Sequence, residues 1–355
     1  MLKIIMNVLV AAKLRDFTLA NMIKPISHLE EVEKIYLVRR TPLDHPKVVT
    51  CCPPKVLNHF RWSAELYRFF IIFWLTCCKK IDVLVGIHFY YHCVYIGIVG
   101  KIFRKPYIFS IIENPKFWIK SKNHYILEKG ARKIFVRGSK SKKFYTDFVG
   151  IEQNQIDVLP DMYMPSLKKI KSVKKKYDLV FLGDLVREKR VDVLLETVRE
   201  VKRKKPLIKV AIIGRGPLKK ELIDLQMKYH LEKNVFFLGY VKDVYEIIEQ
   251  AKVFIMTSET EGLPIVLQEA SNMGLPVVVP DVGDMTDYAK HHENAIVVEP
   301  LNVEQFVQAV FDVLDDQVLY HRLSQRGLEI YMNNKDKFTL DYISSNWHNV
   351  LIQNA

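Results

Sequence analysis

Short apolar runs rich in β-branched residues alternate with segments of helical periodicity along the whole chain. Near-continuous apolar runs occur in strands that are covered on both faces, so these runs indicate parallel sheets. In the second half the expected strands are DLVFLG, KVAIIG, NVFFLG, KVFIMTS, PVVVP and NAIVVE, which begin at Asp178, Lys209, Asn234, Lys252, Pro276 and Asn294.

The segments between these runs carry the signals of helices. VDVLLETVREVKRK has an amphipathic period, and Pro217 suits the start of the helix that follows. Pro264 suits another first turn and Gly274 the position just past a helix end, so we expect a helix over residues 264–273. The alternation of strands and helices predicts a doubly wound α/β domain.

The first half repeats this alternation less cleanly, and 355 residues exceed the usual size of a single core. The segment MPSLKKIKSVKKKY is polar and lysine-rich, as in a linker. We expect a first domain at 1–165, a linker at 166–177, a second domain at 178–320, and a C-terminal helical segment at 321–355 that returns to the first domain. Ligands are expected between the two domains, at the C-terminal ends of their strands. The first-half strands are IIMNVLVAA, KIYLVRR, KVVTCC, DVLVGI, YIFSII, KIFVRG and QIDVLP.

The net charge of +13 lies entirely in the first half of the chain. Residues 1–165 hold 26 Lys and Arg against 13 Asp and Glu, whereas residues 166–355 hold 27 of each kind. A basic half suits nucleic acid, an anionic membrane or a phosphorylated substrate, and the alternative is a solvated basic surface. No nucleic-acid-binding motif is present, so nucleic acid is not an expected partner.

Five cysteines fit neither a disulfide framework nor a C-x-x-C metal site. We expect them to be reduced and mostly buried, which favours the cytoplasm. MLKIIMNVLVAAKLRDF lacks the apolar region of a signal peptide and resembles a first strand. The longest apolar run, FFIIFWLTCC at 69–78, is shorter than the roughly 20 residues of a membrane span. It indicates a buried helix or an interfacial one, and burial is favoured because a helix beside a parallel sheet is normally covered.

The segment GRGPLKK begins like a dinucleotide-binding fingerprint. Lys219 replaces the third glycine, and no acidic residue ends a strand about 20 residues later. A tight turn made by Gly214 and Gly216, with Pro217 starting a helix, accounts for the pattern without NAD.

The segment TSETEGLPIVLQEASNMGLPVVVPDVGDM places Glu261 before the expected helix and Glu269 within it. The apolar residues of this helix surround most of its axis, so Glu269 lies close to buried surface and needs a partner. One alternative is a structural ion pair for Glu269, with Glu261 favouring the positive end of the helix. The other is a nucleotide sugar, whose hydroxyls suit carboxylates and whose diphosphate suits backbone N–H groups at a helix start.

Glu261-GLPIVLQ-Glu269, followed by A-x3-G-x-P-V-V and by DVG at 281–283, resembles the donor site of retaining GT-B glycosyltransferases of family 4. FLGDLVREKRVDVLLE, IIGRGPLKKELIDL, VFFLGYVKD and VFIMTSETEGLP extend this resemblance in the expected order over nearly all of residues 178–300. In the first half DVLVGIHF, KPYIFSI, KIFVRGSKSKKFYTDFVGI and IDVLP resemble the acceptor domain of these enzymes more loosely. The implied fold is GT-B, with two doubly wound Rossmann-like domains facing a central cleft.

The resemblance implies a role for each matching residue. Glu269 would bind the ribose hydroxyls, Glu261 the sugar hydroxyls, and Lys189 would neutralise the departing diphosphate, with a solvated lysine as the alternative. A fixed cation at that point stabilises the transition state more than the ground state. Glu261 and Lys189 are thus the catalytic candidates. The further donor-binding candidates are Gly183, Arg187, Gly214, Arg215, Gly262, Leu263 and Pro264.

The sequence departs from the family pattern at several points. Asp184 stands where the family commonly has arginine, so Arg187 or Arg215 is expected to replace that cation. AAKLRDF replaces the glycine-rich loop after the first strand. Glu113 lies near the position where relatives carry a histidine, and His88 is the other acceptor-side candidate, although a histidine beside a strand is more often a packed residue.

The resulting prediction is a cytoplasmic glycosyltransferase of the hexosyltransferase type (EC 2.4). It would transfer a sugar from a UDP- or GDP-sugar, with retention, to a saccharide or lipid-linked acceptor in surface polysaccharide or glycolipid biosynthesis. No cofactor is expected and no metal, because the chain contains no D-x-D. The basic half predicts peripheral association with the inner face of the cell membrane. A sugar-nucleotide epimerase of the same fold and a non-catalytic binding subunit are the alternatives.

Overall fold

The computed structural model describes residues 5–12, 14, 16–54, 57, 61–87, 91–112, 114, 126–160 and 173–352. The chain forms two compact units: unit 1 is Met1–Pro165 with Asp336–Ala355, and unit 2 is Ser166–Lys335. Of the predicted linker, residues 166–172 lie outside the described residues. The C-terminal segment differs from the expected 321–355, because its first helix belongs to unit 2 and the chain joins unit 1 at Asp336.

The described strands of unit 1 form a seven-stranded parallel sheet in the order β3-β2-β1-β4-β5-β6-β7. Each apolar run predicted in the first half lies in one of these strands. Their side chains are almost fully buried in the central strands, as expected for a sheet covered on both faces. The strands are β1 (Met6–Ala11), β2 (Val32–Val38), β3 (Val48–Cys51), β4 (Val83–Ile87), β5 (Tyr107–Ser110), β6 (Lys133–Val136) and β7 (Ile156–Val158).

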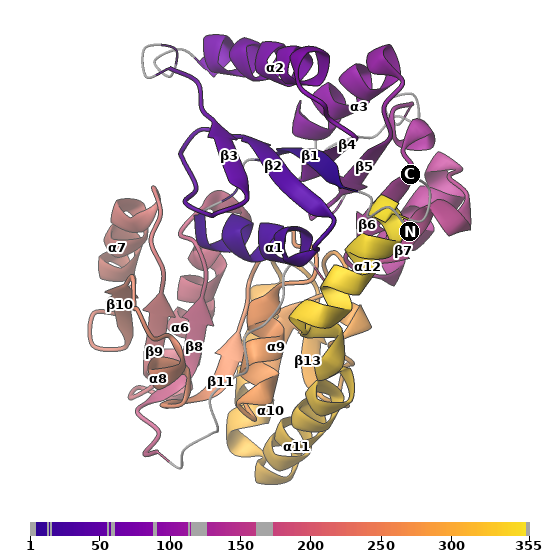
Figure 1. Ribbon diagram of the computed structural model, residues 1–355. Coiled ribbons are helices and arrows are strands. Elements are labelled where there is room, and N and C mark those ends of the chain that lie inside the picture. The colour runs from indigo at the N-terminus through magenta and orange to yellow at the C-terminus, as the bar shows by residue number, and fades with distance from the viewer. Residues whose placement is uncertain are drawn as a thin grey trace. The chain divides into compact units, whose positions relative to one another are not determined.

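Helices cover both faces of this sheet (Figure 1). Helices α1 and α12 pack over one face with the core around Ile23 and Trp347, and α2 and α3 pack over the other with the core around Ile72 and Ile96. The helices and turns of unit 1 are α1 (Asp16–His28), α2 (Arg61–Cys78), α3 (Tyr91–Phe103), η3 (Glu128–Gly130), α5 (Ser139–Lys143), the π-helical η4 (Phe144–Val149), η5 (Gln153–Gln155), η8 (Lys335–Phe338) and α12 (Leu340–Ile352).

Helix α2 is buried on one side only. Ile72 and Leu75 are buried against the sheet, whereas Leu66, Phe70 and Trp74 are 58, 64 and 50% exposed. These three residues are spaced by four and therefore share one face of the helix. The expected burial of the apolar run thus applies to the inner face, while the outer face presents large apolar side chains to solvent.

The described strands of unit 2 form a six-stranded parallel sheet in the order β10-β9-β8-β11-β12-β13. The order turns back between β8 and β11, which is the point where open α/β sheets bind ligands at the C-terminal ends of their strands. Every apolar run predicted in the second half lies in one of these strands. The strands are β8 (Tyr177–Leu182), β9 (Val210–Ile213), β10 (Val235–Gly239), β11 (Ala251–Ile255), β12 (Val277–Pro280) and β13 (Ala295–Val298).

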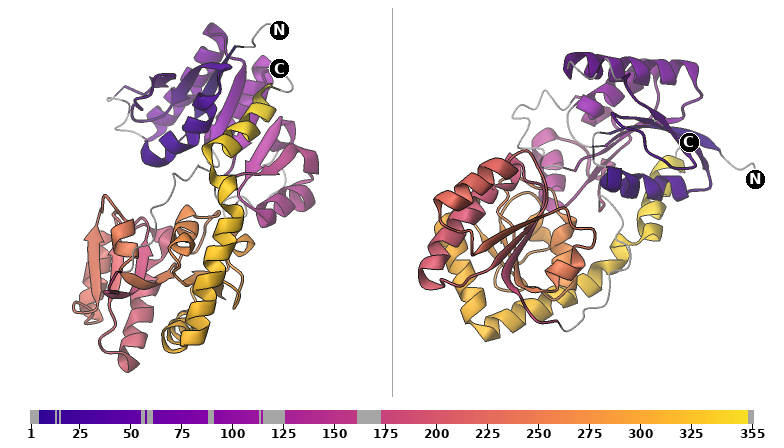
Figure 2. Two further views of the ribbon diagram at one scale, coloured as in Figure 1. Left: turned by 60° about the horizontal axis from the view of Figure 1, so that its bottom comes forward. Right: turned by 90° about the vertical axis from the view of Figure 1, so that its left-hand side faces the viewer.

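The unit 2 sheet also carries helices on both faces (Figures 1 and 2). Helices α6, α7 and α10 pack together over one face, and α11 packs against α9. The expected helix at 264–273 is observed as α9, with Pro264 immediately before it. The elements are η6 (Arg187–Lys189), α6 (Val191–Lys204), α7 (Lys219–Lys228), α8 (Tyr245–Ile248), α9 (Ile265–Asn272), η7 (Met285–Asp287), α10 (Val303–Asp315) and α11 (Gln317–Asn334).

The cysteines are all unbonded thiols, but the expectation that most are buried is wrong. Only Cys93 is buried, while Cys77 and Cys78 are exposed because they end α2 on its outer side. Within the described part of the chain, no helix combines the length and the apolar character that crossing a membrane requires.

Candidate active site

Most of the donor-binding residues predicted from sequence lie in the loops at one edge of the unit 2 sheet. Gly183 directly follows β8 and Gly214 directly follows β9. The loop between β11 and α9 carries Glu261, and Gly283 follows β12. Because parallel strands end at the same edge of a sheet, these segments meet there although they are far apart in sequence.

Two glycines let the loops after β8 and β9 touch. Gly214 has a φ of 151°, and a Cβ atom there would lie 1.8 Å from the carbonyl oxygen of Gly183. The N–H of Gly183 donates to the carbonyl of Ile213 at 3.0 Å. A Cβ atom at Gly183 would lie 3.8 Å from Cδ of Lys189, so the lysine stem runs beside this backbone. The predicted residues Gly183, Gly214 and Lys189 are therefore brought together.

Lys189 and Glu261 form an ion pair between the lysine Nζ and the glutamate Oε1. The side chain of Glu261 is 10% exposed and that of Lys189 is 24% exposed, so the pair is largely shielded from water. The hydroxyl of Ser258 donates to the same Oε1 at 2.7 Å. The two residues predicted to be catalytic are thus in contact, although they are 72 residues apart in the sequence.

The loop from Glu261 to Pro264 rests on the loop after β12. Gly283 has a φ of 54°, and a Cβ atom there would lie 1.9 Å from the carbonyl oxygen of Glu261. The N–H of Asp284 donates to the carbonyl of Gly262 at 3.0 Å. Gly262 and Leu263 are partly buried, and Pro264 caps α9 with φ −70° and ψ 130°. Backbone contacts therefore fix the approach of this loop to the start of α9.

Glu269 lies on α9 and accepts a hydrogen bond of 2.7 Å from the hydroxyl of Tyr245, on α8. Burial raises the pKa of Glu269, and the Tyr245 hydrogen bond acts in the opposite direction. Burial and the neighbouring Glu269 raise the pKa of Tyr245, so the phenol keeps its proton and remains a donor. Glu269 thus has one fixed neutral partner and no ion pair among the described residues.

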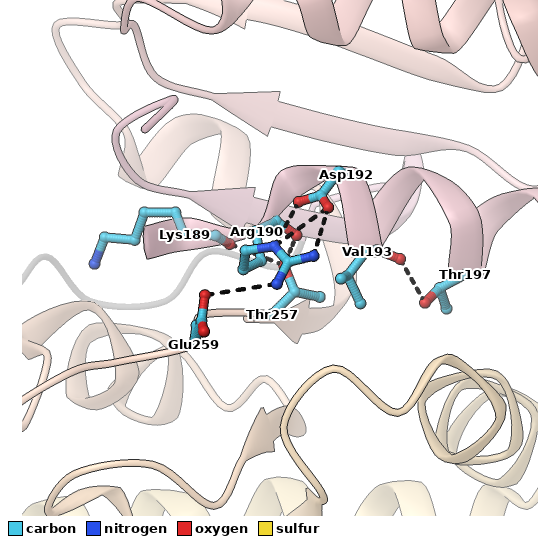
Figure 3. Close-up of polar contacts among 7 residues, drawn as sticks. All are labelled: Lys189, Arg190, Asp192, Val193, Thr197, Thr257 and Glu259. Carbon is cyan, nitrogen blue, oxygen red and sulfur yellow. Dashed lines mark hydrogen bonds and ion pairs between the residues drawn. The ribbon is translucent and has the colours of Figure 1, made fainter. Parts of the chain in front are cut away.

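Arg190 joins the turn that carries Lys189 to the loop that carries Glu261 (Figure 3). Its guanidinium donates to Asp192 at 2.8 to 3.2 Å and lies 3.5 Å from an oxygen of Glu259. The Thr257 hydroxyl, fully buried, lies 3.1 and 2.9 Å from the carbonyl oxygens of Lys189 and Arg190. The N–H of Glu259 donates to the carbonyl of Glu188 at 2.9 Å.

The remaining candidates are more dispersed. Arg187 is exposed in η6, and Arg215 is exposed with its guanidinium 5.3 Å from the ring centre of Tyr240. Asp184 is partly buried in the loop after β8. The acceptor-side candidates His88 and Glu113 lie outside the described residues. Among the residues that the structure describes, no three His, Cys, Asp or Glu side chains gather as metal ligands.

Three residues of this site were not singled out from the sequence: Arg190, Thr257 and Tyr245. Arg190 adopts φ 47° and ψ 47°, a left-handed conformation that is unusual for arginine and has no sequence signal. Thr257 lies two residues after the end of β11, where a threonine of the sequence also fits as an ordinary packed residue. Tyr245 is 24 residues from Glu269, and nothing in the sequence pairs the two.

Residues 165–329 match the model of the family described as glycosyl transferases group 1. The chain is 30% identical over 109 residues to UDP-Gal:alpha-D-GlcNAc-diphosphoundecaprenol alpha-1,3-galactosyltransferase of Escherichia coli, covering 30% of this chain and 28% of the relative. It is 25% identical over 202 residues to poly(ribitol-phosphate) alpha-N-acetylglucosaminyltransferase of Staphylococcus aureus, covering 56% and 40%. The chain spans about half the length of the curated relatives that it matches. These two relatives are named as glycosyltransferases, so the predicted resemblance to this class of enzyme is borne out as a similarity of sequence.

Among solved structures, Anabaena HepE in complex with UDP-glucose is similar to this chain with a TM-score of 0.74. The identity is 15%, and the likeness covers 98% of this chain and 100% of HepE. At this identity the likeness shows the fold alone. The predicted GT-B class, with two doubly wound parallel sheets, is therefore confirmed.

Proposed function

We propose that the protein is a retaining glycosyltransferase of family 4 that moves a hexose from a nucleoside-diphosphate sugar to a saccharide or lipid-linked acceptor. The observation that carries this proposal is the shielded Lys189–Glu261 pair at the edge of the unit 2 sheet, whose Glu261 shares one sequence motif with Glu269. The group 1 match over residues 165–329 supports the class of enzyme. A UDP-sugar is the favoured donor over a GDP-sugar, because HepE was solved with UDP-glucose and the E. coli relative is named for UDP-Gal.

The proposed chemistry follows from the charges at this edge. The bond between the anomeric carbon and the phosphate oxygen breaks, and its electron pair stays on the nucleoside diphosphate. The acceptor hydroxyl oxygen bonds to the anomeric carbon on the face that the diphosphate leaves, and its proton passes to that diphosphate. Lys189 offsets the negative charge that develops on the leaving group. Glu261 binds sugar hydroxyls, Glu269 binds ribose hydroxyls, and neither a metal nor a cofactor takes part.

Incubation with UDP-, GDP- and ADP-sugars, following both the free nucleotide and the sugar product, tests this proposal. A transferase releases nucleoside diphosphate only when an acceptor, or water in place of the acceptor, takes the sugar. The glycosidic product should keep the anomeric configuration of the donor. An altered sugar without transfer would identify an epimerase. Binding without turnover would identify a non-catalytic subunit, the alternative that Asp184, in place of the usual cation, favours. Activity should persist in EDTA. Loss of activity that manganese restores would overturn the metal-free part.

We also propose that unit 1 works at an anionic membrane surface in the cytoplasm, on a lipid-linked or surface-polysaccharide acceptor. The basic excess of the chain lies within residues 1–165. Leu66, Phe70 and Trp74 on the outer face of α2 supply an apolar stripe, and the exposed Lys79 and Lys80 follow the helix directly. An interfacial helix combines these two features, each basic residue near such a surface contributing about 1 kcal/mol.

Co-sedimentation of the full chain with vesicles tests the membrane proposal. Binding should require anionic lipid, weaken as salt rises, and fall when Leu66, Phe70 and Trp74 are all replaced by serine. The matched control replaces Leu207 and Val318, two residues of unit 2 that are 87 and 77% exposed, and should leave binding unchanged. Equal recovery with neutral and anionic vesicles would contradict the membrane proposal and leave the transferase proposal intact.

A further inference from the structure

The turn before α6 contains a backbone conformation that its own residue disfavours. Arg190 stands at the N-terminal cap of α6 with φ 47° and ψ 47°, and its side chain forms no capping hydrogen bond. A left-handed conformation costs a residue with a Cβ atom roughly 1–2 kcal/mol, and glycine avoids this cost. Contacts elsewhere must therefore hold Arg190 in place.

Those contacts come from both sides of the guanidinium. Nε and Nη2 donate to the carboxylate of Asp192, two residues along the chain, at 2.8 to 3.2 Å. Nη1 lies 3.5 Å from Oε2 of Glu259, which belongs to the loop after β11. The guanidinium thus spans the start of α6 and a loop that is separated from it by more than 60 residues.

The backbone of the same two segments is joined as well. The buried hydroxyl of Thr257 lies within hydrogen-bond distance of the carbonyl oxygens of Lys189 and Arg190, and the N–H of Glu259 donates to the carbonyl of Glu188. Lys189 precedes Arg190 directly, and Glu261 follows Glu259 by two residues. Figure 3 shows the Lys189 side chain extending away from the Arg190 guanidinium, so the two cations point in different directions.

We propose that Arg190, together with Thr257, is a positioning residue that holds the Lys189 turn against the Glu261 loop and so keeps the two charged groups of the candidate site in register. This inference rests on the proposed function for its kinetic consequences. Arg190 acts through Lys189 and does not contact the donor, because its guanidinium is engaged by two carboxylates that repel a diphosphate. Glycine would satisfy the backbone of position 190 but would remove the link to Glu259.

The test is a double-mutant cycle between positions 190 and 189. Arg190→Gly should lower kcat on the order of 10- to 100-fold with little change in KM, since misplacing a catalytic group has costs of this size. In the Lys189→Ala background the same substitution should have no further effect, because the group that it positions is gone. Arg190→Lys keeps the charge and should restore part of the rate. Additive losses would overturn the proposal, since Arg190 would then act independently of Lys189.

A second measurement does not depend on catalysis. Acetylation of Lys189 by a water-soluble ester, followed by mass spectrometry, should proceed several-fold faster in Arg190→Gly, with Lys252 as the internal reference because its partner Asp178 is remote from this turn. Arg199→Ala, which removes an arginine paired with Glu196 and Glu200 on α6, is the matched control and should leave Lys189 unchanged. Inactivity of the wild type with every donor would refute the proposed function but not the positioning role of Arg190. The acetylation rates of Lys189 would then test that role. Equal rates in wild type and Arg190→Gly would overturn the inference. If Arg190→Gly failed to fold, Glu259→Gln, which removes the charge that Arg190 faces in the loop after β11, would be judged by the same comparison.

Discussion

Two glutamates of a single motif sit in different electrostatic surroundings. Glu261 faces the cation of Lys189, whereas Glu269 faces the neutral hydroxyl of Tyr245. Burial opposes the charge of the Glu269 carboxylate, and the hydrogen bond from Tyr245 favours it. In the proposed function the two carboxylates have different tasks, Glu261 at the sugar hydroxyls and Glu269 at the ribose diol.

Alanine substitutions should separate these tasks. Glu269→Ala should weaken binding of the nucleotide, whereas Glu261→Ala and Lys189→Ala should depress turnover more than binding. Losing one positioned charged partner costs on the order of 2 to 4 kcal/mol, or roughly 30- to 1000-fold. Steady-state kinetics and calorimetric titration with UDP measure the two effects. Glu196→Ala on α6 is the control, and near-normal constants in all three site variants would end the assignment.

The pH dependence of donor binding should report on Glu269. In the proposed function the ribose hydroxyls donate to the Glu269 carboxylate, so the affinity for the donor should fall as the pH drops through the raised pKa of Glu269. Tyr245→Phe removes the hydrogen bond that favours the charged form, which raises this pKa further and moves the fall in affinity to higher pH. We expect roughly 10-fold weaker binding in this variant near neutral pH. Dissociation constants for UDP across a pH series measure this, and superimposable profiles would argue against a carboxylate role.

At the scale of single elements, the apolar runs located every described strand, because strands buried on both faces need apolar side chains at consecutive positions. Helix α9 was also predictable, since Pro264 and Gly274 mark its two ends. The side of α2 that faces the sheet could not be predicted, because FFIIFWL is apolar around the whole helix and lacks an amphipathic signal. In the site, the motif predicted Lys189, Glu261 and Glu269, but their supporting contacts with Arg190, Thr257 and Tyr245 depend on tertiary structure.

The short element η3 contains a buried carboxyl group in unit 1. Glu128 is 6% exposed, and burial raises its pKa to about 7. The folded state therefore favours the protonated form, so the stabilising contribution is complete below the ordinary value of 4.5 and is lost as the pH rises to about 7. The free energy of unfolding should fall by up to roughly 3 kcal/mol over this range.

Glu128→Gln should abolish most of that pH dependence, because the amide has the same shape but does not ionise. Chemical denaturation at several pH values between 4 and 8 provides the measurement. Glu152→Gln, at an exposed position of the same unit, serves as the control and should retain the wild-type slope. An unchanged slope in Glu128→Gln would mean that another group is responsible.

On the scale of the whole molecule, unit 1 is assembled from two separate stretches of chain. Helix α12 belongs to it, with Trp347 3% exposed and its ring 4.8 Å from that of Phe135 between centroids. Trp347→Ala should destabilise unit 1 by about 3–5 kcal/mol, the usual cost of removing a buried aromatic side chain. Hydrogen exchange should then show faster exchange in β1, β4 and β6 but not in β8 to β12. Equal acceleration in both units would show that they unfold together.

This return of the chain also determines the order in which the two units are completed during synthesis. Unit 2 is continuous from Ser166 to Lys335, so all of its residues are synthesised before Asp336 is added. Chains are synthesised at roughly 5–20 residues per second. The surfaces of α1 and β6 that α12 covers therefore stay uncovered for on the order of ten seconds before α12 is made. The unit that begins first in the sequence is thus the one that is finished last.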